Sequence, residues 1–115
     1  MTPYAKVAVE FATALVEGQF DEAHALLTPP LRKQMSPAAL RDRLYAMWQG
    51  YADGDPERIH FDEEFSHQDW PAKLPGDLGW AYVGIEGDGF VEAVSVIVTD
   101  VGGIPLIRDI EWGRP

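Results

Sequence analysis

The sequence contains no cysteine. Disulfide bonds, thiolate nucleophiles and cysteine-based metal sites are therefore excluded for this chain. It also has no apolar run that approaches the length of a membrane-spanning helix. Residues Met1–Tyr4 do not form a basic segment that leads into an apolar one, so the sequence predicts no signal peptide and a cytoplasmic location.

Positive charge is scarce as well. Nine Lys and Arg residues stand against 19 Asp and Glu residues, which gives a net charge of −10 and a pI near 4.5. Binding of nucleic acid or of an anionic membrane surface requires clustered basic residues, and the nine here are scattered. We therefore predict neither a nucleic-acid nor a membrane partner. The acidic surplus serves solubility, or it neutralises a basic protein partner.

Motifs of common catalytic and metal sites are missing too. The glycine pairs read as turns and not as a phosphate loop, and no Ser–His–Asp arrangement is indicated. His60, Asp62, His67 and Asp69 could supply nitrogen and oxygen ligands, but their spacing matches no metal cage. We predict no cofactor and no metal, and the motifs do not decide whether the chain is an enzyme.

What the sequence does contain is a strand-rich final third, from Gly79 to Trp112. Asp88-Gly89 and Gly102-Gly103 are tight-hairpin signals between β-branched runs, and at Asp88-Gly89 both central positions are expected to take a positive φ. Three antiparallel strands are predicted, over Trp80–Ile85, Phe90–Val101 and Ile104–Trp112. Pro105 cannot donate a ladder hydrogen bond, so the last of these strands is predicted to begin at an edge or a bulge.

Two-residue loops at both turns would fix the strand register and sort the side chains onto two faces. One face would carry Trp80, Tyr82, Ser95, Ile97, Thr99, Leu106, Arg108, Ile110 and Trp112. The other would carry Ala81, Val83, Ile85, Val94, Val96, Val98 and Ile107, with Glu92, Asp109 and Glu111 toward one end. Both faces are largely apolar, whereas a solvated antiparallel sheet has one polar face. We therefore predict helices on one face and a second copy of the chain on the other, which makes a homodimer through the sheet.

The first half predicts three helices. Thr2-Pro3 and Ser36-Pro37 pair an N-cap residue with proline at the first helical position, and Asp21 can begin a short helix between them. The apolar stripe of the third helix extends to Trp48 and Tyr51. A first strand is predicted over Arg58–Phe65 and a loop over Ser66–Leu78, within one domain that spans residues 1–115.

Two stretches carry a resemblance to a known superfamily. They are VEGQFDEAHALLTPPLRKQMSPAALRDRL at Val16–Leu44 and GFVEAVSVIVTDVGGIPLIRDIEW at Gly89–Trp112. Together they resemble the nuclear transport factor 2-like (cystatin-like) superfamily at the level of the fold. The resemblance implies an α+β fold, with three N-terminal helices packed on a curved, mostly antiparallel sheet of about four strands. It also implies a pocket between helices and sheet and frequent dimerisation through the outer face. Members include enzymes, small-molecule binders and structural adaptors, so the fold does not choose the function.

Glu63 and the pair His60 and Asp62 are the candidate catalytic residues. Glu63 is predicted between Phe61 and Phe65 on an apolar strand face, where loss of water would raise its pKa toward that of a general acid or base. The alternative is a Glu63 paired with Arg108 or exposed at the rim of the sheet. His60 and Asp62 share the opposite face of the strand, as a tuned general base or as ordinary solvated residues.

Aromatic and basic side chains give the candidate ligand-binding residues, which are Trp80, Tyr82, Arg108, Trp112, Trp48 and Tyr51. Arg108 interrupts an apolar strand face, where it binds a carboxylate ligand or pairs with an internal Glu. The first hypothesis is therefore a non-catalytic homodimeric module that binds a small apolar or acidic molecule, or a partner protein. The second is a cofactor-independent dehydratase, isomerase or hydrolase with Glu63 or the His60 and Asp62 pair as base and Tyr82 as helper. The third is an acidic protein that neutralises a basic partner.

Overall fold

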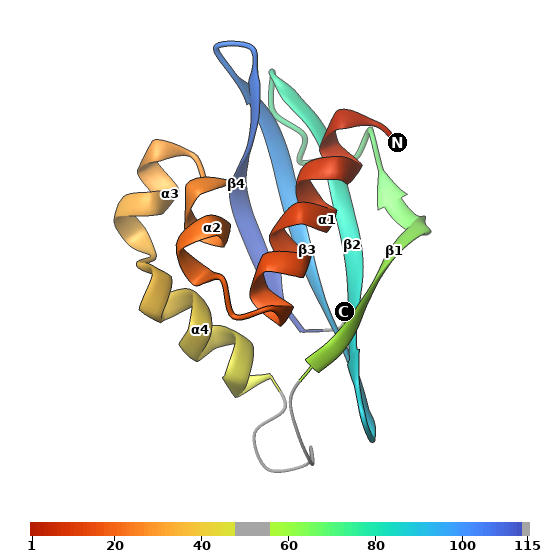
Figure 1. Ribbon diagram of the computed structural model, residues 1–115. Helices are drawn as coiled ribbons and strands as arrows, with labels where there is room; N and C mark the ends of the chain where they lie inside the picture. The colour runs from red at the N-terminus through yellow and green to blue at the C-terminus, as the bar shows by residue number, and fades with distance from the viewer. Residues whose placement is uncertain (48–55, 114–115) are drawn as a thin grey trace.

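A computed structural model describes residues 1–47 and 56–113. Four helices precede four strands in this part of the chain (Figure 1). The elements are α1 (Pro3–Val16), α2 (Phe20–Ala25), α3 (Pro29–Gln34), α4 (Pro37–Ala46), β1 (Pro56–His67), β2 (Asp77–Gly87), β3 (Phe90–Val101) and β4 (Ile104–Trp112). The predicted α+β class and the four antiparallel strands are confirmed. No helix in the described part is long and apolar enough to cross a membrane.

Proline starts three of the four helices. Thr2, Thr28 and Ser36 are the N-cap residues, and each is followed by proline in the first turn, where the missing N–H is not needed. Ser36 Oγ also accepts a hydrogen bond from the Ala39 N–H at 3.1 Å. The described part thus has one short helix, α3, in addition to the three that were predicted. Thr28-Pro29-Pro30, interpreted as the end of the second helix, begins α3.

The last helix is also shorter than its apolar stripe predicts. The described helix α4 ends at Ala46, with Met47 as its C-cap residue. Trp48 and Tyr51, which were predicted to continue the stripe and to line a ligand pocket, lie outside the described residues.

The sheet is a simple meander in the order β1-β2-β3-β4, with antiparallel pairing throughout. Both predicted two-residue hairpin loops are confirmed, because Gly87 pairs with Phe90 and Val101 pairs with Ile104. The expected positive φ at Asp88 is wrong. Only glycines have a positive φ in the described part, among them Gly89 at 83°.

One bulge changes the predicted faces of the last strand. Val98 pairs with Ile107 and Ile97 pairs with Asp109, so Arg108 is an extra residue in β4. Every side chain after it changes face. Ile110 and Trp112 therefore lie on the helix face and not beside Trp80 as predicted, while Asp109 and Glu111 lie on the opposite face.

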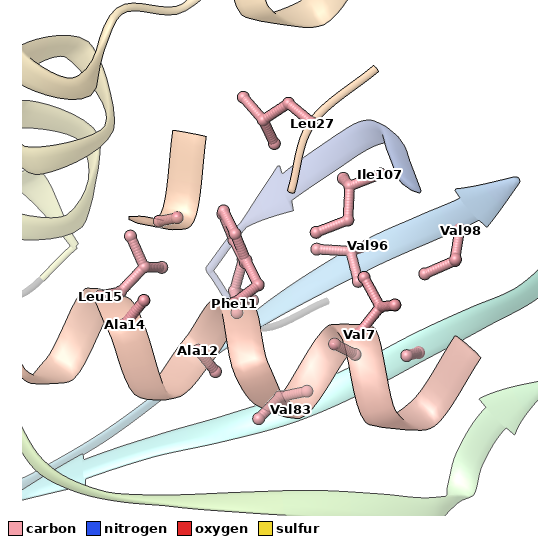
Figure 2. Close-up of a cluster of buried hydrophobic side chains, with 14 of the residues drawn as sticks. Val7, Phe11, Ala12, Ala14, Leu15, Leu27, Val83, Val96, Val98 and Ile107 are labelled. Atoms are coloured by element: carbon pink, nitrogen blue, oxygen red, sulfur yellow. The ribbon is translucent and has the colours of Figure 1, made fainter. Parts of the chain in front are cut away.

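Helix α1 packs on one face of the sheet and forms the centre of the core. Phe11 and Leu15 are fully buried among Val83, Val96 and Ile107 (Figure 2). Burying one such side chain stabilises the fold by about 2–3 kcal/mol. Residues 26–28 add a short parallel bridge to β4, because the Ile107 N–H donates to the Leu26 carbonyl and the Thr28 N–H donates to the Ile107 carbonyl, both at 2.8 Å.

The helices thus cover one face, and the opposite face of the sheet carries no described helix (Figure 1). We call this opposite face the outer face.

Candidate functional site

Two neighbouring rows of paired residues on the outer face cross all four strands. The first row is His67, Trp80, Ile97 and Asp109, and the second is Asp62, Tyr82, Ser95 and Glu111. Polar residues therefore lie on β1, aromatic rings on β2, small or aliphatic side chains on β3 and carboxylates on β4. Trp80 and Tyr82, both predicted ligand-binding residues, lie side by side in the two rows.

Each aromatic ring on β2 has a ring partner from β1. The His67 ring stacks on Trp80 with centroids 5.6 Å apart and planes 20° apart. The Phe65 ring lies 5.4 Å from that of Tyr82 and is 56% exposed. Phe65 is therefore an exposed ring beside a half-buried one, on a face without a described helix.

The bulge in β1 explains why Phe65 is on this face. The register moves from the Asp62–Tyr82 pair to the His67–Trp80 pair, so β1 holds several extra residues opposite Ala81. Asp62 Oδ1 accepts hydrogen bonds from the N–H groups of Glu64 and Phe65 at 3.0 and 3.2 Å. Ser66 Oγ donates to the Asp62 carbonyl and accepts from the Tyr82 N–H. The prediction that Phe65 shares the apolar face of Phe61 is therefore wrong.

The three candidate catalytic residues do not form one site. His60 is exposed on the outer face and pairs across the sheet with Gly84. Asp62 uses its carboxylate to hold the bulge. Glu63 is exposed at the beginning of that bulge and is not enclosed between aromatic rings as predicted. It is also not the partner of Arg108.

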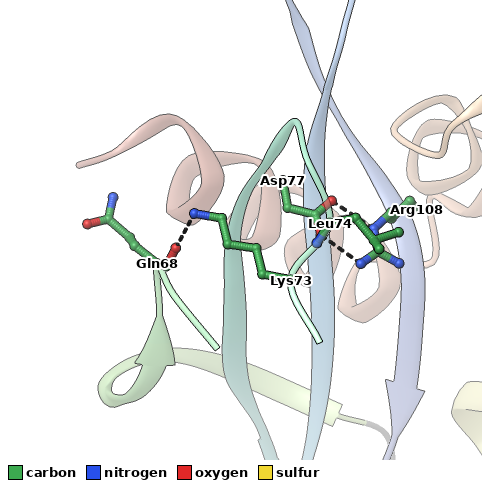
Figure 3. A network of polar contacts seen from close by, with 5 residues as sticks. All are labelled: Gln68, Lys73, Leu74, Asp77 and Arg108. Atoms are coloured by element: carbon green, nitrogen blue, oxygen red, sulfur yellow. Dashed lines mark hydrogen bonds and ion pairs between the residues drawn. The ribbon is translucent and has the colours of Figure 1, made fainter. Parts of the chain in front are cut away.

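Arg108 pairs instead with Asp77, at the start of β2 (Figure 3). Its Nε donates to Asp77 Oδ1 and its Nη2 donates to Oδ2, both at 2.7 Å, which is the bidentate geometry of a strong ion pair. The Asp77 side chain is 0% exposed and that of Arg108 is 24% exposed. The Leu74 N–H also donates to Asp77 Oδ2, at 2.8 Å. The predicted internal partner was a Glu, whereas the structure pairs Arg108 with Asp77, which was not singled out from the sequence.

This pairing sets the ionisation of Asp77. The hydrogen bonds from Arg108 hold the pKa of the Asp77 carboxyl below its ordinary value, against the opposing effect of burial. Asp77 therefore remains a carboxylate at neutral pH, although it is buried. It anchors the end of the loop 68–76 to β4.

A groove of about 500 Å³ lies between that loop and the first row. Its lining residues are His67, Trp70, Ala72, Leu74, Trp80, Ile97, Arg108, Asp109 and Glu111. Trp70, Ala72 and Leu74 come from the loop and the others from the sheet. Trp70, Asp109 and Glu111 were not predicted as site residues, because their position depends on the loop path and on the β4 bulge.

Trp112 lies away from this groove. Its ring is on the helix face, with its centroid 6.5 Å from that of Phe11 and 5.9 Å from the guanidinium carbon of Arg43. It therefore does not share a surface with Trp80 and Tyr82. A separate cavity of about 300 Å³ beside Trp112 is lined also by Arg43, Ala46, Met47, Glu92 and Gly113.

Tyr4 forms a second polar feature at the sheet edge of the core. Its ring makes an edge contact with Phe61, 6.3 Å between centroids, and lies directly against Gly79, where a Cβ atom would overlap it. Burial raises the pKa of the Tyr4 hydroxyl, and the negative charge of Glu63 raises it further. The close contact explains the glycine at position 79, which the sequence alone left unexplained.

The described residues contain no group of three or more His, Asp or Glu side chains that could hold a metal ion. In particular, His60 and His67 lie in different rows of the outer face. Comparison with known protein families, curated proteins and solved structures gave no match for this chain.

Proposed function

We propose that this chain is a non-catalytic binding module that acts as a homodimer through the outer face of its sheet. The observation that carries the proposal is the exposed Phe65 ring against Tyr82, on a face that no described helix covers. Phe65 and Tyr82 form a continuous apolar surface there.

The placement of the acid–base candidates favours binding over catalysis. A general base needs a partner or a pocket that tunes its pKa and holds the substrate near it. Glu63 and His60 are exposed and separate, and Asp62 is engaged by two backbone N–H groups. Arg108 is likewise engaged, so it supports an acidic ligand less than the sequence indicated.

The proposed fold family is the nuclear transport factor 2-like superfamily. Its support is the order of the elements, with all helices before a four-stranded antiparallel meander and with α1 packed across one face. Members that dimerise through the sheet use the face that is exposed here.

Native mass spectrometry and light scattering at several protein concentrations test the dimer. We expect a dimer for the wild-type chain, and a shift toward monomer for Phe65→Ser. The matched control is Ile104→Ser, which replaces a similarly exposed residue, 59% against 56%, at the tip of the β3–β4 hairpin. The control should remain a dimer. A wild-type monomer at all concentrations, or equal behaviour of the two variants, contradicts the proposal. The same spectra report any retained small molecule.

A further inference from the structure

The groove beside the loop 68–76 places an aromatic side chain opposite a carboxylate. Trp80 on β2 and Asp109 on β4 belong to the same row and are separated by Ile97 on β3. Neighbouring strands lie about 4.8 Å apart, so β2 and β4 are about 10 Å apart. Ile97 is only 9% exposed and forms the floor of the groove. An aromatic wall thus faces an acidic wall across an apolar floor.

The aromatic wall can accept a cation. The His67 ring, from β1, stacks on Trp80. Ile97 lies next to Trp80 on the other side, on β3. The face of an indole ring attracts cations electrostatically. The loop already contains one such contact, because Lys73 Nζ lies 5.9 Å from the centroid of the Trp70 ring while it donates to the Gln68 carbonyl (Figure 3).

The charge of the groove also favours a cation. Arg108 is the basic side chain among the lining residues, and its charge is matched by the buried Asp77. Asp109 and Glu111 are both exposed, and neither forms an ion pair within 4.0 Å among the described residues. Asp109 Oδ1 accepts a hydrogen bond from the Ile110 N–H, and Arg108 acts on Asp109 only at longer range. Lys73 offsets part of this charge from the loop. The groove is therefore negative, as is the whole chain.

We propose that this groove binds arginine side chains of an extended segment of a partner protein. Arginine fits better than lysine, because a planar guanidinium can stack on Trp80 and donate two parallel hydrogen bonds to a carboxylate. Asp109 and Glu111 are two residues apart on one strand face, a spacing of about 7 Å, which is the repeat of alternate residues in an extended chain. The proposal rests on the proposed function. The homodimer is proposed through Phe65 and Tyr82, and the groove lies beside the loop 68–76 at Trp80, so the two proposed surfaces are separate parts of the outer face.

The test is a titration of the isotope-labelled chain, followed by NMR, with the peptide acetyl-Gly-Arg-Gly-Arg-Gly-amide. Peptides with lysine or glutamate in place of arginine are the comparison. We expect the arginine peptide to bind most tightly and to shift the Trp80 indole N–H and the amides of Asp109 and Glu111. The glutamate peptide should cause no shift. The double variant Asp109→Asn, Glu111→Gln should weaken binding about tenfold or more. The control Asp100→Asn removes an exposed carboxylate outside the groove and should leave binding unchanged.

Three outcomes would overturn the proposal. One is equal binding of the arginine and glutamate peptides. Another is equal affinity of the groove double variant and the Asp100 control. The third is a set of shifts confined to Glu10, Glu17 and Glu22, which line a different acidic hollow between α1 and α2 and would indicate binding by charge alone. Oligomeric state is measured on the same samples. A dimer that fails to bind the peptide refutes the groove alone, whereas a monomer refutes the homodimer by itself.

Discussion

Replacing Arg108 with methionine should destabilise the fold far more than removing any exposed arginine. The variant leaves the Asp77 carboxylate, which is 0% exposed, with only the Leu74 N–H and the nearby Thr99 side chain as partners. Leaving one member of a buried ion pair without its partner costs about 3 kcal/mol or more. For a chain of this size the loss corresponds to a fall in Tm of about 12 °C. It is a large part of the total stability of about 5–15 kcal/mol that such domains have.

Urea unfolding, followed by circular dichroism, measures the effect. The matched control is Arg58→Met, because Arg58 also forms ion pairs, with Glu57 at 3.2 Å and Glu86 at 3.8 Å, but its side chain is 60% exposed. That control should lose about 0–1 kcal/mol. Adding Asp77→Asn to Arg108→Met removes the stranded carboxylate and should recover part of the loss. Equal losses for the two single arginine variants would refute the reasoning, since burial would then have no influence on the pair.

Three further predictions concern Asp77, Gly79 and Tyr4. The pKa of Asp77 is lower in the folded chain than in the unfolded chain, so its ionisation stabilises the fold above the unfolded pKa of about 4. This stabilisation is lost as the pH falls through the lower folded pKa. The difference in unfolding free energy between wild type and Asp77→Asn should therefore disappear in acid. Gly79→Ala should lower the free energy of unfolding in urea by about 1–3 kcal/mol, because the new Cβ atom overlaps the Tyr4 ring. The loss should nearly vanish when Tyr4 is also replaced by alanine. Purely additive losses in the double variant would contradict the contact. Because the pKa of Tyr4 is raised in the folded chain, its contribution to the free energy of unfolding is present below about pH 10 and is lost as the pH rises through the folded pKa. Ultraviolet titration should show a lower Tyr4 pKa in Glu63→Gln. An unchanged titration would count against the effect of Glu63.

The sequence predicted those parts of the fold that depend on local chemistry. Gly102-Gly103 ends one strand and begins the next because both residues adopt a positive φ, 61° and 90°. Proline after Thr2 and Ser36 marks two helix starts for an equally local reason. Thr28-Pro29 is the same signal, and it was misinterpreted because a second proline follows it and because the residue before a proline avoids the helical region.

The parts that could not be predicted depend on contacts between distant residues. The strand IPLIRDIEW is compatible with either face at each position, since apolar residues lie on both sides of Arg108. Its bulge coincides with an ion pair to Asp77, 31 residues earlier in the chain. The alternation of residues within the strand cannot indicate that Arg108 pairs with Asp77. The bulge after Asp62 is similar, because Ser66 is held by the Tyr82 N–H of the next strand.

The Arg108 bulge joins the stability of the fold to the proposed recognition surface. A regular β4 strand would place Asp109 and Glu111 among the valines of the core and Ile110 and Trp112 on the outer face. The extra residue reverses this, so that Trp112 packs against Phe11 while both carboxylates reach the groove. Asp77, the partner of Arg108, also accepts a hydrogen bond from the Leu74 N–H. It therefore holds the loop that forms the other side of the groove. The Arg108–Asp77 ion pair therefore positions both β4 and the loop 68–76, which line the groove. A variant that weakens this ion pair should lose arginine binding even while the chain remains folded.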